Sequence, residues 1–548
     1  MPEKFADLAL RNGAIYSNGT VRPGSVAVAG PTIAYAGPDE GIADLCGPET
    51  MVIDLQGGLV LPGFIDSHIH SSFGGLFRIE CDLSGLTSEA AYLKAIAAYA
   101  AADKDKKYLR GNGWLPSAFG PHGPNKAALD AVVPDRPAVI TSCDGHAAWV
   151  NSIALKMAGI DAGFHAPEGG VIERDPGTGE PAGTLREFSA IQLVEAVLPD
   201  PSVAARKAGA LLYMEKLAAA GITAIHDAAV TEDVAETYAA LDAAGLLTLH
   251  VRASFICEPD QGAGQVDRLL ELRGKYRGKE FSPASAKIFL DGVVEGHTAF
   301  LCAPYADSPG AFGRSLWEKT LLLETVQALD KAGVQIHIHA IGDAAVRMAL
   351  DAFEAAAKAN GRRDSRHTIA HLELVSPADA PRFRELGIIA CFQPTWFYKD
   401  EFSDSQLGAI LGPERAQGRF RMNSLLGAGA MVSCGSDWPV GGDFITLKPL
   451  DSIQIGVSRR GIGDKDGAPY MPEERLDIAV MTDCYTRNGA YAAFLEESTG
   501  SLEAGRLADL IVLDRNIFSI PSEEIHKAKV LLTLFKGKIV FRNTEYIF

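Results

Sequence analysis

The sequence lacks a surplus of positive charge, and this excludes two classes of partner. Its 548 residues include 51 Lys and Arg against 69 Asp and Glu, giving a formal net charge of −18. Binding to nucleic acid or to an anionic membrane surface depends on clustered basic side chains that release counterions. We therefore expect neither nucleic acid nor a membrane as a partner.

Long apolar runs and closely paired cysteines are also missing. No stretch of about 18 uninterrupted apolar residues occurs, and the N-terminus carries charges where a secretory signal needs an apolar core. We expect a cytoplasmic protein. The eight cysteines are spread without Cys-x-x-Cys pairs and lie mostly among apolar residues. This spacing predicts buried free thiols, with neither a disulfide framework nor a thiolate zinc site.

What the sequence does contain is a repeated alternation of apolar strands with alanine-rich helices, for example 324–332 and 344–360. Eight such strands in alternation predict an α/β fold, a (β/α)8 TIM-like barrel. The eight candidate strands are residues 59–66, 222–227, 250–255, 286–290, 335–339, 367–371, 388–392 and 431–435.

Two other regions do not follow this alternation. Both ends of the chain read as short strands between Gly, Pro and Asn turns, which predicts a small β-sandwich domain built from residues 1–58 and 500–548. Within the barrel domain of residues 59–499, the segment 74–220 exceeds an ordinary connection and is expected to be an insertion after the first strand. An insertion at the catalytic face of a barrel usually shapes its pocket.

Histidines follow the first candidate strand and point to a metal site. Side chains at i and i+2 share one face of a strand, so His68 and His70 would present two imidazoles to the same side. Imidazole nitrogen suits zinc and similar ions. The alternative is a pair of polar residues that simply closes a strand.

Other strands also end in polar side chains, at the barrel edge where active sites lie. His339 and His371 end two strands, although His337 and His367 share their faces and spacing alone does not choose between them. Asp437 follows the eighth strand closely enough to reach a metal site. Lys287 lies in an apolar strand, where it either becomes a metal-bridging carbamate or reaches a carboxylate such as Asp291, and spacing alone favours the second.

These motifs together resemble the amidohydrolase superfamily, and more narrowly its amidohydrolase 3 group, whose members include YtcJ-like proteins and N-substituted formamide deformylases. The resemblance runs from about residue 8 to residue 541. It rests on several motifs in the right order, namely Pro62-Gly-Phe-Ile-Asp-Ser-His-Ile-His70, Lys287-Ile-Phe-Leu-Asp-Gly-Val-Val-Glu-Gly-His-Thr-Ala299, His339-Ala-Ile-Gly-Asp343, Phe392-Gln-Pro-Thr395, Gly435-Ser-Asp437 and the segment 143–155.

The resemblance implies a centre with divalent metal, two zinc ions by expectation. Carried over residue by residue, it gives His68 and His70 to one metal, His339 and His371 to the second, and Lys287 as a bridging N6-carboxylysine. Asp437 would be both a ligand to the first metal and the catalytic proton carrier. Histidine, carboxylate and carbamate ligands also accept manganese, cobalt or iron, so the ligand set does not fix the metal.

The implied activity is hydrolysis of a C–N bond in an amide, N-formyl or cyclic amide of a small molecule, using a metal-activated hydroxide. The alternatives are a deaminase or decarboxylase at the same site, or a metal-free homologue without activity. Aromatic residues near the site favour an apolar or aromatic substrate. The candidate substrate-binding residues are Trp114, Asp144, His146, His297 and Trp396. A homodimer is expected from the resemblance alone.

Overall fold

The computed structural model describes residues 5–120, 122–143, 145, 147–167, 170–399, 401–439, 447–464 and 466–545. The chain forms two compact units. The larger comprises Met1–Ile69, Met214–Ser436 and Thr446–Phe548, and the smaller comprises His70–Tyr213 and Asp437–Ile445.

A sheet of eight parallel strands forms the centre of the larger unit, which confirms the predicted (β/α)8 barrel. Its strand order is β6-β13-β14-β15-β16-β17-β18-β19, as chain order requires in this fold. The strands are β6 (Phe64–Ile69), β13 (Ile222–Val230), β14 (His250–Ile256), β15 (Phe281–Phe289), β16 (Gln335–Ala340), β17 (Thr368–His371), β18 (Ile389–Phe392) and β19 (Met431–Cys434).

Amphipathic helices alternate with these strands and bury their apolar faces, as the alanine-rich segments predicted. In α10, for example, Val346, Leu350 and Phe353 recur at helical spacing and are buried. The helices of this unit include α7 (Glu232–Ala243), α8 (Val266–Tyr276), α9 (Lys319–Lys331), α10 (Asp343–Asn360), α11 (Ala380–Leu386), α14 (Met422–Gly427), α15 (Pro449–Ser458), α16 (Ile478–Cys484) and α17 (Arg487–Ala492).

The first strand differs from its prediction. The apolar run 59–66 divides at Gly63 into β5 (Leu59–Pro62), which pairs with β1 and β20 in another sheet, and β6, which opens the barrel. A Cβ at Gly63 would lie 2.1 Å from Thr223 Oγ1, so only glycine fits where the chain passes between the sheets. The Pro62-Gly63 dipeptide marks the division, but the apolar residues on both sides of it give the pattern of one buried strand, because both halves are buried.

Asp66 joins the first and last strands of the barrel. Its buried carboxylate accepts hydrogen bonds from the backbone N–H groups of His68 and Ser436, each at 3.1 Å. Gly435 approaches so closely that a Cβ there would lie 2.4 Å from the backbone nitrogen of His68. A side chain and a glycine contact therefore bring the ends of β6 and β19 together.

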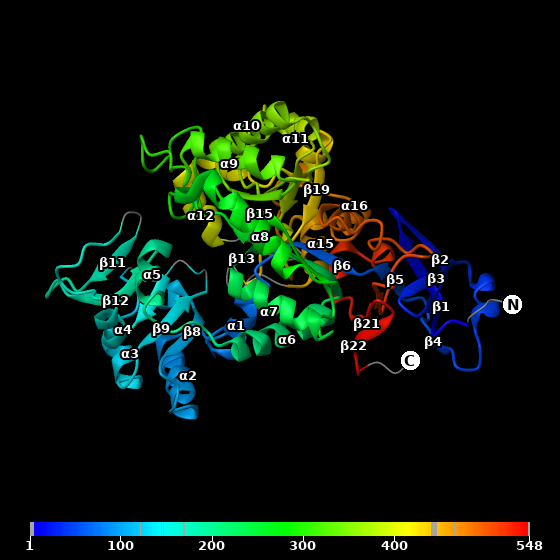
Figure 1. The fold of residues 1–548 in the computed structure, drawn as a ribbon, viewed down its shortest axis with the longest axis horizontal. Coiled ribbons are helices and arrows are strands. Elements are labelled where there is room, and N and C mark those ends of the chain that lie inside the picture. The colour runs from blue at the N-terminus through cyan, green and yellow to red at the C-terminus, as the bar shows by residue number, and fades with distance from the viewer. Residues whose placement is uncertain are drawn as a thin grey trace. The chain divides into compact units, whose positions relative to one another are not determined.

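The second sheet of the larger unit takes strands from both ends of the chain, seen in Figure 1 as blue and red ribbons side by side. Its order is β22-β21-β20-β5-β1-β2-β3, with β4 (Met51–Asp54) paired to β1. Leu10, Val26, Val60, Val512 and Leu532 are among its buried core residues. The remaining strands are β1 (Leu8–Ser17), β2 (Thr20–Ala29), β3 (Thr32–Gly37), β20 (Leu510–Leu513), β21 (Val530–Phe535) and β22 (Lys538–Arg542).

A buried cluster of charges links this terminal sheet to the barrel. His250, the first residue of β14, lies between Glu280 (Nδ1 to Oε2, 2.9 Å) and Asp509 (Nε2 to Oδ2, 3.0 Å), and Lys536 contacts Glu280 at 2.6 Å. Burial alone would lower the pKa of His250, but its two carboxylate partners outweigh burial and raise it. The bond from His250 lowers the pKa of Glu280 to about 2.

The smaller unit contains a six-stranded sheet in the order β11-β12-β10-β9-β8-β7. The strands are β7 (Cys81–Asp82), β8 (Leu109–Trp114), β9 (Ala138–Ser142), β10 (Ala147–Val150), β11 (Val171–Arg174) and β12 (Pro181–Arg186), and the helices include α1 (Ser71–Ile79), α2 (Glu89–Ala102), α3 (Lys126–Val132), α4 (Ser152–Met157) and α5 (Phe188–Glu195). Helix α6 (Val203–Ala219) continues into the larger unit.

Two further expectations can be compared with the structure. All eight cysteines are free thiols, as predicted, and Cys81, Cys257, Cys391, Cys434 and Cys484 are buried, whereas Cys302 is exposed. Among the described residues, no helix combines the length and apolar character needed to cross a bilayer.

Candidate metal centre

His68 and His337 form a direct hydrogen bond inside the barrel. His68 Nδ1, from β6, lies 2.8 Å from His337 Nε2, from β16, and both rings are buried. A hydrogen bond at one ring nitrogen fixes the orientation of the other, and proteins commonly hold metal-ligating histidines in this way. The sequence left the role of His337 open, and the structure makes it the hydrogen-bond partner of His68.

His371, the last residue of β17, is oriented by Gln393. His371 Nδ1 lies 2.9 Å from Gln393 Oε1, and because an amide oxygen only accepts, Nδ1 carries the proton and Nε2 the lone pair. A ring nitrogen of His371 lies within 4.8 Å of one of His68. The φ angles of His371 and Leu372 are 78° and 54°, a left-handed conformation that costs about 1–3 kcal/mol per residue and concentrates at functional sites.

His339 lies beside His371, with the two ring centroids 4.4 Å apart. Its Nε2 is 3.3 Å from the carbonyl oxygen of Gly292 and 3.7 Å from Asp291 Oδ1. A carbonyl accepts only, so Nε2 donates and the lone pair of His339 is on Nδ1. His68, His339 and His371 therefore gather at the carboxyl ends of their strands, where a (β/α)8 barrel places its active site.

Lys287 is completely buried on β15, directly opposite His337 in the strand register. Its Nζ lies 4.6 Å from the centre of the Phe289 ring. The carboxylate considered from sequence as its partner, Asp291, accepts three backbone N–H bonds from Phe300, Ile341 and Gly342 at 2.9–3.0 Å. Burial raises the pKa of Asp291 to about 7, and the three N–H bonds oppose that rise.

His226 extends the histidine group beneath His337. Its ring centroid is 4.7 Å from that of His337, and its Nε2 contacts the hydroxyls of Ser254 and Ser285 at 2.7 and 3.0 Å. Burial, reinforced by the charge of Lys287, lowers the pKa of His226 to about 3, and burial lowers the pKa of His337 well below its usual value. These imidazoles are neutral at neutral pH, the state in which a histidine ring has a lone pair to offer.

In the smaller unit, His70 and Asp437 form a pair of their own. His70 directly follows the last residue of β6, and its Nε2 lies 3.1 Å from Asp437 Oδ1. The backbone N–H of His70 donates to the carbonyl of Trp438 at 2.8 Å. Asp437 has a φ of 59°, again in the left-handed region.

The residues present fit a divalent transition metal. Neutral imidazoles with a defined lone pair are the preferred ligands of zinc and its neighbours in the series, and their second ring nitrogens are held by protein groups, as such sites require. In His371 the bond to Gln393 leaves the lone pair on Nε2, in His68 one ring nitrogen is held by His337, and the fully buried Lys287 lies opposite His337 in the strand register.

The structure also locates the residues predicted to contact substrate. The ring of Trp396 is half-buried and stacks on His371, with centroids 5.8 Å apart. His297 is 36% exposed and pairs with Asp307 at 3.0 Å, so it contacts a carboxylate of its own loop. Its proposed contact with substrate stays a prediction.

The other predicted contacts belong to the smaller unit. Trp114 is in the core of that unit, where its indole N–H donates to the carbonyl of Ile140 at 2.8 Å and its ring packs against Phe119. This packing accounts for its burial, and a role for it in binding substrate stays a prediction. Asp144 and His146 lie outside the described residues.

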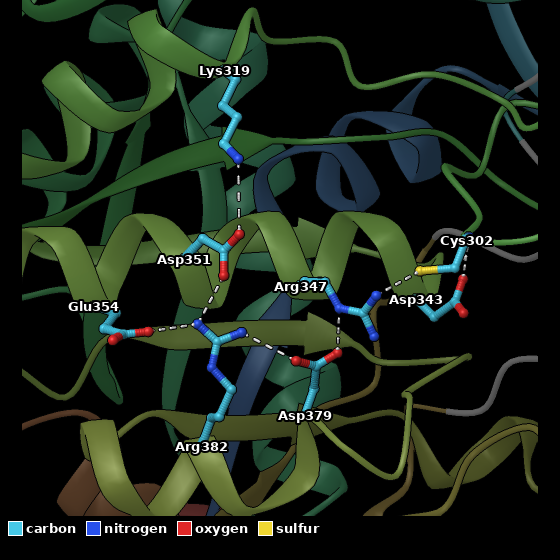
Figure 2. A network of polar contacts seen from close by, with 8 residues as sticks. All are labelled: Cys302, Lys319, Asp343, Arg347, Asp351, Glu354, Asp379 and Arg382. Atoms are coloured by element: carbon cyan, nitrogen blue, oxygen red, sulfur yellow. Dashed lines mark hydrogen bonds and ion pairs between the residues drawn. The ribbon is translucent and has the colours of Figure 1, made fainter.

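Asp343, the last residue of the His-Ala-Ile-Gly-Asp motif, forms a structural hydrogen bond. Its carboxylate accepts the backbone N–H of Cys302 at 2.9 Å. Figure 2 shows Arg347, one turn further along α10, reaching both the Cys302 sulfur and Asp379. Asp343 thus helps to fix the backbone at Cys302.

Sequence reasoning gave no role to two residues of this centre. Gln393 was noted only as part of a motif, although its position directly after β18 was a signal that it faces the site. His226 is in mid-strand, and nothing in its local pattern separates it from an ordinary buried residue.

Comparison with known proteins identifies the family of the chain. A family model described as the amidohydrolase family matches residues 51–541. The chain is 32% identical to Protein LONG AFTER FAR-RED 3 of Arabidopsis thaliana over 98% of this chain and 92% of that protein. It is 30% identical to the putative amidohydrolase YtcJ of Bacillus subtilis (91% and 92% covered) and 29% identical to the N-substituted formamide deformylase of Arthrobacter pascens (95% of each).

A solved structure agrees with the sequence comparison. An uncharacterised metal-dependent hydrolase from Pyrococcus furiosus superposes with a TM-score of 0.74 at 26% identity, covering 93% of this chain and all of that one. Because the family model spans most of the sequence and the barrel carries a buried histidine group at its strand ends, this chain belongs to the amidohydrolase family of metal-dependent hydrolases.

Proposed function

We propose that this protein hydrolyses a C–N bond of a small amide, N-formyl or cyclic amide substrate with an apolar or aromatic group. The observation that carries the proposal is the group of histidines at the strand ends, of which His68 and His371 are buried and His371 has its lone pair placed on Nε2 by the bond to Gln393. The similarity to an N-substituted formamide deformylase over most of both chains supports the reaction class.

The ligand set that we propose has two parts. His68 and His70 hold a first divalent ion, zinc by preference, together with Asp437. His339 and His371 would hold a second, and Lys287 would add an anionic ligand as the carbamate that its amine forms with carbon dioxide, with loss of a proton. The carbamate would also remove the cost of burying an ammonium in an apolar strand. When bound, such ions activate water and polarise a carbonyl oxygen.

The chain's own residues supply the remaining chemistry. Water adds to the carbonyl carbon, and we assign Asp437 to accept its proton and to pass that proton to the nitrogen as the C–N bond breaks. The products are an acid and an amine. Trp396, half-buried and stacked on His371, offers a flat apolar surface for the substrate. Gln393 and His337 hold the ligating rings in position.

Substitution of Asp437 tests the proton-transfer role. We expect Asp437→Asn, which keeps an oxygen ligand but cannot accept the proton, to keep most of the bound metal and to lose turnover by a factor of about 100 or more, because a general acid–base contributes roughly that much. Bound metal is measured by elemental analysis, and turnover with a panel of N-formyl and N-acyl amines and cyclic amides. Full activity in this variant would refute the assigned role.

The products distinguish the reaction class. An amine released together with an acid supports the proposal. Release of ammonia alone from a ring amine, or of carbon dioxide, would replace it with deamination or decarboxylation, and a protein that holds no stoichiometric transition metal would be a homologue without this activity.

A further inference from the structure

A separate cavity lies at the start of the barrel strands, away from the strand ends that carry the metal ligands. Its volume is about 250 Å³. It opens beside His367 and Ile388, the residues that directly precede β17 and β18, whereas His371 ends β17. Its lining consists of Asp330, Phe353, Ala357, Gly361, Arg362, Arg363, Ser365, His367, Arg384, Glu385, Leu386, Gly387 and Ile388.

The charge of this cavity is opposite to that of the protein. Three arginines face two acidic residues in its lining, while the chain as a whole carries a net charge of −18. Arg363 is already paired with Asp330, at 2.8 Å. Within the part of the chain that the structure describes, Arg362 and Arg384 form no ion pair. Two guanidinium groups are therefore available to an anion.

Part of the lining is apolar. It consists of Phe353, Ala357, Leu386 and Ile388, of which Ala357 and Leu386 are half-buried, while Phe353 and Ile388 are nearly covered and Phe353 stacks on His367 with ring centroids 4.8 Å apart. Apolar walls with a few charged groups that fix orientation are typical of small-molecule sites. A bare inorganic anion would leave the apolar part without a contact.

Ion pairs hold the two walls of the cavity in place. Phe353 and Ala357 are on α10, and Arg384 is on α11. Figure 2 shows Arg382 of α11 reaching Asp351 and Glu354 of α10, at 2.8 and 3.0 Å. Because these ion pairs connect α10 and α11 directly, the cavity is already formed before a ligand binds. Binding therefore carries little cost for ordering its walls.

We propose that this cavity binds a small carboxylate that carries a flat apolar group. Arg362 and Arg384 would contact the carboxylate, and the apolar part of the lining would contact the flat group. Arginine forms paired N–H bonds to carboxylates, which gives such contacts strength and direction. The site is distinct from the metal centre and does not depend on the function proposed above.

Titration calorimetry on the full-length, metal-loaded protein tests the proposal, with benzoate, acetate and inorganic phosphate as probes. We expect saturable benzoate binding, weaker binding of acetate, and no tighter binding of phosphate. In the double variant Arg362→Gln/Arg384→Gln, benzoate binding should weaken by a factor of at least about 10, since each charge-assisted bond is worth that much.

Two further variants control this experiment. Arg22→Gln removes an exposed arginine of the terminal sheet and should leave benzoate binding unchanged. Ala357→Phe fills the cavity without changing its charge and should also abolish binding. Benzoate binding that persists in both cavity variants lies elsewhere, for example at the metal centre, and overturns the proposal. Absent binding to the unmodified protein, or tighter binding of phosphate than of benzoate, overturns it as well.

Discussion

Buried histidines occur at both ends of the barrel, but their surroundings are opposite. At the strand ends His68 contacts His337, and His226 lies beneath them, so histidines face one another and a buried lysine. At the base, His250 lies between two carboxylates. Burial lowers the pKa values of His226 and His337 in the first arrangement, and two carboxylates raise that of His250 in the second. Histidine is thus a neutral ring at the carboxyl ends of the barrel strands, and at their start it is a charged residue that joins two carboxylates.

The comparison teaches that burial alone does not reveal what a histidine does. All of these rings are nearly inaccessible to water. Burial lowers the pKa of each of these rings, and the pKa of His250 is raised because two carboxylates outweigh that effect. Each end of the barrel can therefore be tested by a different measurement, metal affinity at one and stability against pH at the other.

The largest effect is expected from His371→Ala. The variant loses a proposed ligand whose lone pair is already oriented, so metal affinity should fall by more than about 100-fold, beyond the 10- to 100-fold range that is typical of outer partners. Chelator competition measures the affinity. His122→Ala, a change at an exposed histidine, is the control. An unchanged affinity for His371→Ala would remove this residue from the ligand set.

A smaller effect is expected at His337. Replacement by leucine removes the hydrogen-bond partner of His68 Nδ1 without touching a proposed ligand, and we expect metal affinity to fall by about 10- to 100-fold. His337→Gln, which keeps a hydrogen-bonding group, should recover part of the loss. Equal losses in both variants would indicate that His337 only fills space.

The stability contributed by the charged cluster around His250 should depend on pH. Because the pKa of His250 is raised in the folded state, its stabilising contribution is complete below the unfolded value of about 6.5 and is lost as pH rises through the folded value. Glu280 behaves oppositely: its folded pKa is about 2, so its contribution is present above its ordinary pKa and is lost as pH falls towards about 2. The cluster is therefore strongest in mildly acidic solution.

Denaturant unfolding of His250→Gln measures this contribution. We expect a loss of about 2–3 kcal/mol near pH 5.5, the usual size for bonds to charged groups, and a smaller loss at alkaline pH. His122→Gln is the matched control, because its side chain is 72% exposed. A loss that does not change with pH would mean that His250 contributes packing but no charge.

Much of this fold could be predicted from sequence, because barrel strands are apolar runs with a polar residue at the catalytic end. Seven of the eight candidate strands overlap the observed ones closely. The exception is the first, residues 59–66, which divides at Gly63 and enters two sheets. His68, His339 and His371 were found for the same reason, since each is at or beside the end of a strand.

The partners of these residues could not be predicted in the same way. The contact between His68 and His337 spans 269 positions, and that between His250 and Asp509 spans 259. No local pattern records such distances, so the sequence could not say which histidine of 337 and 339 faces which neighbour. Trp114 shows the opposite problem, because an aromatic residue after a strand has the same pattern in a core as in a pocket.

The pairing of β5 with β20 has a consequence for synthesis of the chain. Strand β5 adjoins, through Gly63, the strand that carries His68, yet its partner β20 is made some 450 positions later. Until then β5 has an exposed edge, and such edges invite pairing with other chains. Ribosome-bound chains that end before residue 510 should therefore depend more on chaperones than complete ones.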